Sequence, residues 1–275
     1  MEQLSGKVAV VTGAGSGIGR ALTRRLVREG MRVIAADIEA SALAETTATI
    51  DNASTFLADV SKFDDVEALA EHAYETYGPV DVLCNNAGVF AGGLMWERPA
   101  SDFEWTLGVN LWGQLNGIRA FVPRMLTAGN EAHIVNTVSM AGILAMPFTG
   151  PYTISKFASL AATECLAHDL ASVDANISVS ALVPSLIATR IGESGRNRPA
   201  TLAADRSSDA TYVEQALLDS TTQQGMHPDE VAALVVDAIR TKTFLVPTKP
   251  SFAVQIEERT KAQLARELPA MPVID

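Results

Sequence analysis

The segment YTISK, at positions 152 to 156, places a tyrosine and a lysine four residues apart. On a helix this spacing puts Tyr152 and Lys156 on one face. A free tyrosine has a pKa of about 10, too high for a base near neutral pH, and a nearby ammonium favours its phenolate form. Ser139 lies thirteen positions before the tyrosine. The pattern indicates either a polar stripe on a surface helix or an acid–base device.

A second pattern has the chemistry of an anion site. Residues 12–19 read TGAGSGIG, after a short apolar run and at the start of a helical pattern. The glycines permit a tight turn and a close approach of the backbone to a diphosphate. The helix that follows offers free N–H groups to that anion. The context predicts a dinucleotide site rather than a purely structural turn, with contacts from Gly13, Ser16, Gly17, Ile18 and Gly19.

Asp37 follows the second apolar run. Its carboxylate can accept hydrogen bonds from both hydroxyls of a ribose and would repel a 2′-phosphate. Neither Ile38 nor Ser16 supplies a cation for such a phosphate. This favours NAD over NADP as the cofactor. A second role for Asp37, as the cap of the next helix, is compatible with the first.

Short β-branched runs alternate with longer helical patterns along the chain, which predicts a parallel sheet with helices on both faces. The predicted fold is a single doubly wound, Rossmann-like α/β domain over residues 1–275 with about seven strands. Residues 187–225 are expected to be largely irregular, with a weak helical pattern, and to act as a substrate lid. The expected strands are 7–12, 32–36, 54–58, 80–84, 133–137, 177–182 and 244–247; the expected helices are 18–29, 62–77, 101–128, 151–173, 229–240 and one in the tail.

Composition excludes several classes of function. The net charge of −11 disfavours a nucleic-acid partner. The two cysteines and four histidines show no ligand spacing, so no metal is expected. No apolar stretch approaches the roughly 20 residues that span a membrane, and no signal peptide is recognised. A cytoplasmic location is the resulting expectation.

The order of these motifs resembles that of the short-chain dehydrogenases/reductases. The motifs occur in the same order as in that family: TGAGSGIG, the NNAG at positions 85 to 88, Asn110, Ser139 and YTISK. The resemblance covers residues 5 to about 190 and continues more weakly to 250. It implies an NAD(P)-dependent oxidoreductase and favours the acid–base interpretation of YTISK.

The resemblance also implies roles for individual residues. Tyr152 would be the general acid–base, with Lys156 lowering its pKa and bonding the nicotinamide ribose. Ser139 would bind the substrate oxygen, and Asn110 would hold a water beside the lysine; a satisfied buried amide is the compatible alternative for Asn110. The remaining cofactor contacts that it implies are Asp59 and Val60 at the adenine, Asn86, Ala87 and Gly88 beside the cofactor, and Pro184, Ile187 and Thr189 around the nicotinamide.

The pocket is expected above the carboxyl ends of the strands, with an apolar lining from residues 90–96 and 140–148 and from the lid. Trp96, Met140, Met146 and Phe148 are its candidate substrate contacts. The predicted reaction is hydride transfer between NAD and a hydrophobic secondary alcohol, including cyclic or aromatic ones, with its ketone as product. Two alternatives stay open: an NADH-dependent ketone or β-ketoacyl reductase, and a non-catalytic NAD-sensing protein.

The resemblance further implies a homotetramer or homodimer. The family pairs its long fourth and fifth helices between subunits. The corresponding segments, 101–128 and 151–173, are rich in apolar and small residues, as such an interface requires: Leu107, Leu111, Leu115, Ala158, Ala161 and Ala162.

Overall fold

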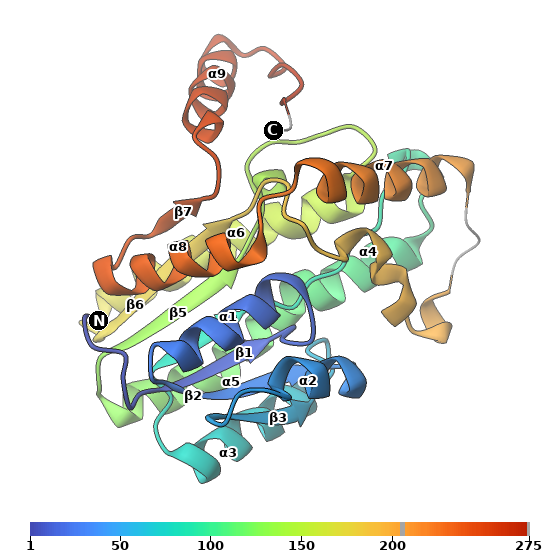
Figure 1. The fold of residues 1–275 in the computed structure, drawn as a ribbon. Helices are drawn as coiled ribbons and strands as arrows, with labels where there is room; N and C mark the ends of the chain where they lie inside the picture. The colour runs from blue at the N-terminus through green and yellow to red at the C-terminus, as the bar shows by residue number, and fades with distance from the viewer. Residues whose placement is uncertain (204–206, 274–275) are drawn as a thin grey trace.

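The computed structural model describes residues 1–203 and 207–273. At its centre lies a seven-stranded sheet in the order β3-β2-β1-β4-β5-β6-β7, in which all neighbouring strands are parallel (Figure 1). The predicted doubly wound α/β fold is therefore confirmed. The strands are β1 (Val8–Thr12), β2 (Arg32–Asp37), β3 (Ala53–Leu57), β4 (Val82–Asn85), β5 (Ala132–Thr137), β6 (Ile177–Val183) and β7 (Leu245–Pro247).

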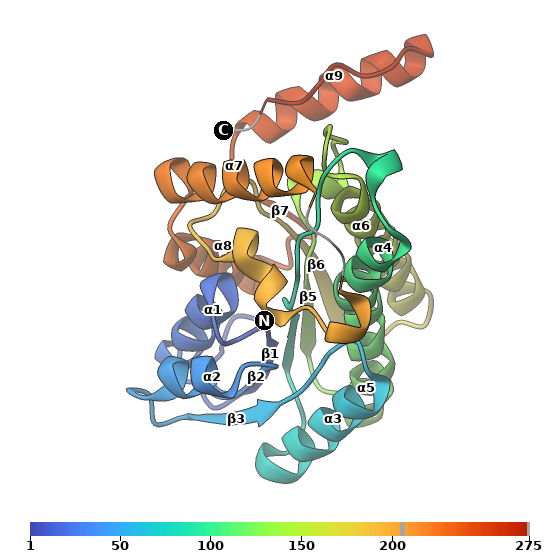
Figure 2. The same ribbon diagram turned by 90° about the vertical axis from the view of Figure 1, so that its right-hand side faces the viewer.

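Helices cover both faces of this sheet, as the views in Figures 1 and 2 show. One face is covered by α1 and α8, and the other by α3, α5 and α6. The α-helices of the described residues are α1 (Gly17–Arg28), α2 (Ala40–Thr47), α3 (Phe63–Tyr77), α4 (Ala100–Leu107), α5 (Gly113–Ala128), α6 (Gly150–Ser172), α7 (Ser208–Gln224), α8 (Pro228–Thr241) and α9 (Ser251–Ala265).

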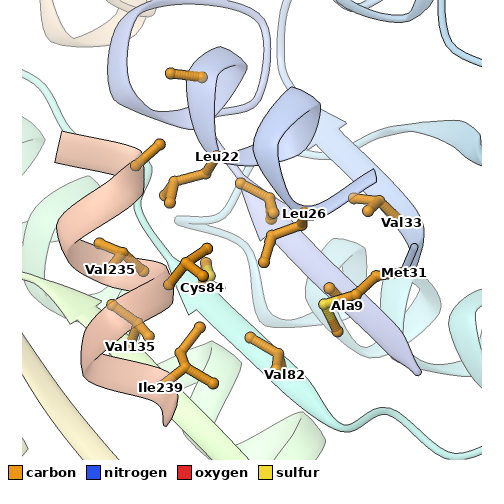
Figure 3. Packing of buried hydrophobic residues seen from close by; sticks show 14 of the residues in the cluster. Ala9, Leu22, Leu26, Met31, Val33, Val82, Cys84, Val135, Val235 and Ile239 are labelled. Atoms are coloured by element: carbon orange, nitrogen blue, oxygen red, sulfur yellow. The ribbon is translucent and has the colours of Figure 1, made fainter. Parts of the chain in front are cut away.

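The apolar runs become central strands because both of their faces are buried. Successive side chains of a strand point to opposite faces. In β1, Ala9 and Val11 join the cluster under α1 and α8, whereas Val8 and Val10 join the cluster under α3 and α5. Figure 3 shows the first cluster, where residues of both helices meet the strands. All five residues of β1 are buried.

The order of the strands in the sheet determines where a ligand site can form. The chain runs from β1 outward to β3 and then returns to form β4 on the other side of β1. The loops after β1 and β4 therefore diverge and leave a crevice at the carboxyl ends of the strands, where ligands bind in open parallel sheets.

Two helix predictions need correction. The helix expected over 101–128 is divided into α4 and α5 by a π turn, Gly108–Trp112. Such a turn inserts one residue into the helix, which apolar spacing does not reveal. The segment 187–225 is less irregular than expected, because it contains the 17-residue helix α7. Its helical pattern is weak in the sequence because α7 buries only Ala210 and Thr221 fully. Residues 204–206 of this segment lie outside the described residues.

The C-terminal helix α9 extends away from the body of the domain in both views (Figures 1 and 2). Phe252 is its one buried side chain, and Leu264 is largely exposed. Across the described ranges, every helix is too short or too polar to cross a membrane.

Candidate active site

At the glycines of the turn between β1 and α1, neighbouring atoms lie so close that a side chain would not fit. Gly13 and Gly17 have φ values of +66° and +49°, which L side chains adopt rarely. A Cβ on Gly13 would lie 2.8 Å from the Ala87 Cα, and one on Gly19 would lie 2.1 Å from the Gly13 carbonyl oxygen. A diphosphate could therefore approach the backbone and meet the first N–H groups of α1. The turn fits the predicted nucleotide.

Asp37 lies next to this turn at the end of β2. Its Oδ2 accepts a hydrogen bond from the Gly15 amide at 2.8 Å, and its Oδ1 accepts one from the Glu39 amide at 3.0 Å. The carboxylate thus braces the turn and the start of α2. Each oxygen retains acceptor capacity for a sugar hydroxyl, so the structural and the binding roles are compatible.

The carboxyl ends of three neighbouring strands are joined by side-chain hydrogen bonds. The amide group of Asn86 donates to the Thr12 carbonyl at 3.0 Å, and its oxygen accepts from the Thr137 hydroxyl at 3.2 Å. The Thr137 carbonyl in turn accepts from the Lys156 Nζ at 2.8 Å. The ends of β1, β4 and β5 are therefore fixed relative to the lysine.

Ser139, Tyr152 and Lys156 come together, although they lie on different elements. Ser139 follows β5, while α6 carries the tyrosine and the lysine on one face. Ser139 lies close enough to the Tyr152 side chain for hydrogen bonding to lower the tyrosine pKa. The Lys156 Nζ lies 5.8 Å from the centre of the tyrosine ring. Phe90 covers this ring with a centroid separation of 5.2 Å.

Burial dominates the electrostatics of this group. It raises the pKa of Tyr152, and the Ser139 hydrogen bond lowers that pKa only in part. Burial also lowers the pKa of Lys156 to about 8. Lys156 is not among the causes of the shift at Tyr152, so the expected lowering of the Tyr152 pKa by Lys156 stays a prediction. The ammonium is desolvated along with the phenol, and its hydrogen bond goes to the Thr137 carbonyl.

Asn110 lies on the π turn and is buried. Its Oδ1 accepts from the Val89 amide at 2.8 Å, and its Nδ2 donates to the Val89 carbonyl at 3.0 Å and to the Ser155 Oγ at 2.9 Å. It thus braces the loop after β4 against α6. A Cβ on Gly88 would lie 3.4 Å from this Oδ1 and 3.6 Å from the Lys156 Nζ. Asn110 and the lysine therefore flank the same glycine.

One cavity of about 410 Å³ extends from the glycine-rich turn to the tyrosine. Its substrate half is apolar, with Val89, Phe90, Trp105, Leu144 and Leu202 among its lining residues. The predicted site residues that line the cavity are Gly13, Ser16, Gly17, Ile18, Asp37, Ile38, Asp59, Val60, Asn86, Ala87, Gly88, Ser139, Met140, Met146, Tyr152, Lys156, Pro184, Ile187 and Thr189.

Four predicted site residues are not part of this lining. Gly19 and Asn110 support it from behind, as described above. Trp96 lies in a short 3₁₀ turn with its side chain 78% exposed, and Phe148 is also exposed. The Gly93 amide donates to the Phe148 carbonyl at 2.7 Å, so the two loops close on each other and leave both aromatic rings outside. As pocket contacts, Trp96 and Phe148 are wrong predictions.

Several lining residues were missed by the sequence reasoning. Trp105 is not among the predicted substrate contacts, but it lines the cavity from α4. Pro272 and Val273 reach the cavity from the tail, and no local pattern encodes that return. Glu39, two residues after Asp37, also lines the cavity, and its proximity to Asp37 was the available signal.

Within residues 1–203 and 207–273, no three His, Cys, Asp or Glu side chains are grouped so as to hold an ion. Cys84 is buried in the sheet, and burial raises its thiol pKa to about 12.

The sequence and the structure were compared with those of known proteins. The sequence profile of the short chain dehydrogenase family matches residues 7–199. The CLA biosynthesis dehydrogenase/reductase of Lactiplantibacillus plantarum is 30% identical over 285 aligned residues, which span 100% of this chain and 99% of that protein. The 1-deoxy-11-beta-hydroxypentalenate dehydrogenase of Streptomyces exfoliatus is 40% identical over 64% of this chain and 66% of its own.

A solved structure agrees with these matches. The short chain dehydrogenase/reductase of Burkholderia phymatum, crystallised in complex with NAD, superposes with a TM-score of 0.96 at 37% identity, covering 99% of both chains. The resemblance drawn from the motifs is thereby confirmed. The chain belongs to the short-chain dehydrogenase family of oxidoreductases.

Proposed function

We propose that the protein interconverts an apolar secondary alcohol, including cyclic or aromatic ones, and its ketone with NAD as the cofactor. The observation that carries this proposal is that Ser139, Tyr152 and Lys156 line the same cavity as the glycine-rich turn. An acid–base group and a nucleotide cradle that share one cavity suit a proton transfer coupled to a hydride transfer.

Each residue of the site has its own role in the proposed reaction. A bound nicotinamide would supply the hydride acceptor. The Tyr152 oxygen takes the alcohol proton as a phenolate, or returns it to the ketone in the reverse reaction. The Ser139 hydroxyl bonds the substrate oxygen and stabilises charge that develops there. Lys156, when protonated, stabilises the phenolate, and Asn110 holds a water beside the lysine.

NAD is favoured over NADP by the charges around Asp37. Its carboxylate would repel a 2′-phosphate. Arg196 is a cation of the same lining, but it is ion-paired with Glu39 at 2.8 Å. The NAD complex of the Burkholderia phymatum relative supports the same choice.

Several polar groups of the lining already have hydrogen-bond or ion-pair partners within the protein, which favours an uncharged, apolar substrate. The hydroxyls of Thr149, Ser194 and Thr221 donate to backbone carbonyls nearby. Arg190 is paired with Glu193 at 2.6 Å. A charged substrate group would therefore meet few free partners. The Streptomyces relatives are named for a hydroxylated carboxylate, which agrees with an alcohol as the reacting group but does not support the absence of charge.

Two alternatives remain as proposals. The first is an NADH-dependent ketone reductase, including a β-ketoacyl reductase, which would use the same residues in the opposite direction. The second is a non-catalytic NAD sensor, against which the complete set of Ser139, Tyr152, Lys156 and Asn110 argues.

The proposal is tested by a turnover assay that follows reduced-nicotinamide absorbance. Purified protein is offered NAD or NADP with a panel of apolar secondary alcohols, matched charged alcohols, and the corresponding ketones with the reduced cofactors. We expect turnover of apolar members with NAD. Faster turnover with NADP, or of charged members only, would contradict the assignment; tight NAD binding without any turnover would favour the sensor.

We also propose that the protein assembles as a dimer or tetramer through α5 and α6. Trp112 and Ile154 are large apolar side chains exposed on this part of the molecule, at 51% and 41%. Sedimentation equilibrium should give two or four chains, and a monomer at micromolar concentration would contradict the proposal. The cytoplasmic location stays a prediction.

A further inference from the structure

A contact between distant parts of the chain crosses the cofactor half of the cavity. Glu39 immediately precedes α2, whereas Arg196 and Asn197 end the 3₁₀ segment Ile191–Asn197. The Glu39 Oε1 accepts hydrogen bonds from the Arg196 Nε at 3.0 Å and the Asn197 Nδ2 at 2.7 Å. The Arg196 Nη2 lies 2.8 Å from the same oxygen.

The three residues belong to the walls of the cavity. Glu39 lines it beside Asp37, and Arg196 and Asn197 line it from the opposite segment. The side chains of Glu39 and Arg196 are each 26% exposed. Although burial alone would raise the pKa of Glu39, its bonds to Arg196 and Asn197 lower that pKa overall. The carboxylate is thus held charged where the two walls meet.

The segment is fastened on its inner side as well. Ser194 is buried, and its hydroxyl accepts a hydrogen bond from the Phe90 amide at 2.8 Å. This bond joins the segment to the loop after β4. The segment therefore bridges the cavity between a buried inner attachment at Ser194 and a partly exposed outer one at Glu39.

We propose that Glu39, Arg196 and Asn197 form a clasp that retains the dinucleotide. The proposal rests on the NAD-binding function proposed above. With the clasp closed, segment 191–197 lies across the adenosine half of the cavity, so the nucleotide leaves only after these bonds open. An exposed ion pair contributes little when it acts alone, but here three donor groups converge on one carboxylate oxygen, and bonds to charged groups are the stronger ones. The residues act on nucleotide exchange and have no part in the chemical step.

Stopped-flow displacement of NADH by excess NAD, followed by nicotinamide fluorescence, measures the release rate directly. Glu39→Gln removes the charge while keeping the shape, and Asn197→Ala opens the clasp from the other wall. Glu67→Gln is the matched control, because it breaks the similarly exposed Arg124–Glu67 pair, and neither residue of that pair lines the cavity.

We expect NADH to leave Glu39→Gln about tenfold faster than wild type, and Asn197→Ala severalfold faster, with release from Glu67→Gln unchanged. Added salt should accelerate release from wild type more than from Glu39→Gln, because salt screens the ion pair. The rate of hydride transfer in a single turnover should be unchanged.

The outcomes separate the two proposals. If both clasp variants release NADH within twofold of the wild-type rate, the clasp is refuted while the NAD-binding function stands. If wild-type protein binds no NADH, the proposed function fails and the clasp with it. Should Glu39→Gln fail to fold, Asn197→Ala gives the decision.

Discussion

Replacing Lys156 with methionine should stabilise the protein at neutral pH while removing its activity. The lysine side chain is buried, with the residue 3% exposed, and its Nζ bonds the Thr137 carbonyl. Burial lowers its pKa from the ordinary value of 10.5 to about 8. Methionine has a similar length and carries no charge, so the variant isolates the free energy of burying the ammonium.

The size of the effect follows from the pKa. Each tenfold change in a protonation constant corresponds to about 1.4 kcal/mol. A fall in the pKa from 10.5 to about 8 therefore makes the charged lysine about 3 kcal/mol less favourable in the folded protein than in the unfolded chain. Loss of the hydrogen bond to Thr137 offsets about 1 kcal/mol of this. The free energy of unfolding of Lys156→Met should exceed that of wild type by about 2 kcal/mol at pH 7.

The extra stability of Lys156→Met over wild type should shrink as the pH rises. At pH 7 the lysine is charged in both states, and the folded state bears the full penalty. Between about pH 8 and 10.5 the unfolded wild-type chain binds more protons than the folded protein. The free energy of unfolding of wild type therefore rises with pH relative to that of Lys156→Met. By pH 10 the advantage of Lys156→Met should have fallen by about 2 kcal/mol.

Urea unfolding of wild type and Lys156→Met, followed by circular dichroism at pH 7 and pH 10 without nucleotide, measures this difference. The two proteins should have equal denaturant slopes, so that the midpoints report stability. A variant less stable than wild type by the same amount at both pH values would refute the reasoning, because the lysine would then stabilise the fold through packing.

Three further predictions follow from the site. Gly19→Ala should lower the affinity for NAD, measured by calorimetry, and should lower the free energy of unfolding by about 1–3 kcal/mol, because its Cβ would lie 2.1 Å from a carbonyl oxygen. In the control variant Gly108→Ala the new Cβ would have no neighbour nearer than 3.8 Å. Its NAD affinity and its stability should therefore be nearly unchanged. Ser139→Ala should lower kcat for alcohol oxidation about 10²- to 10³-fold and move the rise of the pH–rate profile to higher pH, because its hydrogen bond lowers the pKa of Tyr152; an unmoved profile would contradict this. Trp96→Ala should keep kcat/KM within about twofold of wild type, since its side chain lies outside the cavity; a tenfold loss would restore Trp96 as a substrate contact.

Much of the fold was predictable because its signals are local. The buried run that forms β1 and the glycines that follow it constrain their own backbone, so strand, turn and helix could be placed within a few residues. Tyr152 and Lys156 were placed correctly on one helix face for the same reason. The π turn at Asn110 escaped prediction because it depends on contacts with Val89 and Ser155, which lie far away in the sequence.

The substrate side was less predictable because it is built by tertiary contacts. Trp96 and Trp105 lie only nine residues apart, yet one is exposed and the other lines the cavity. Which one faces inward depends on how the loop after β4 is tied to Phe148 and to α7. The contacts of Glu39 with Arg196 likewise join residues 157 positions apart, a distance over which apolar periodicity carries no information.

The most direct test of the central claim is the turnover of Tyr152→Phe beside wild type. Both proteins are given NAD and the best alcohol of the panel, and NADH binding is measured in parallel by fluorescence. Removal of the hydroxyl should abolish turnover, while NADH affinity changes little, because the Tyr152 oxygen moves the substrate proton. Turnover within tenfold of wild type would show that another group carries the proton and would contradict the account.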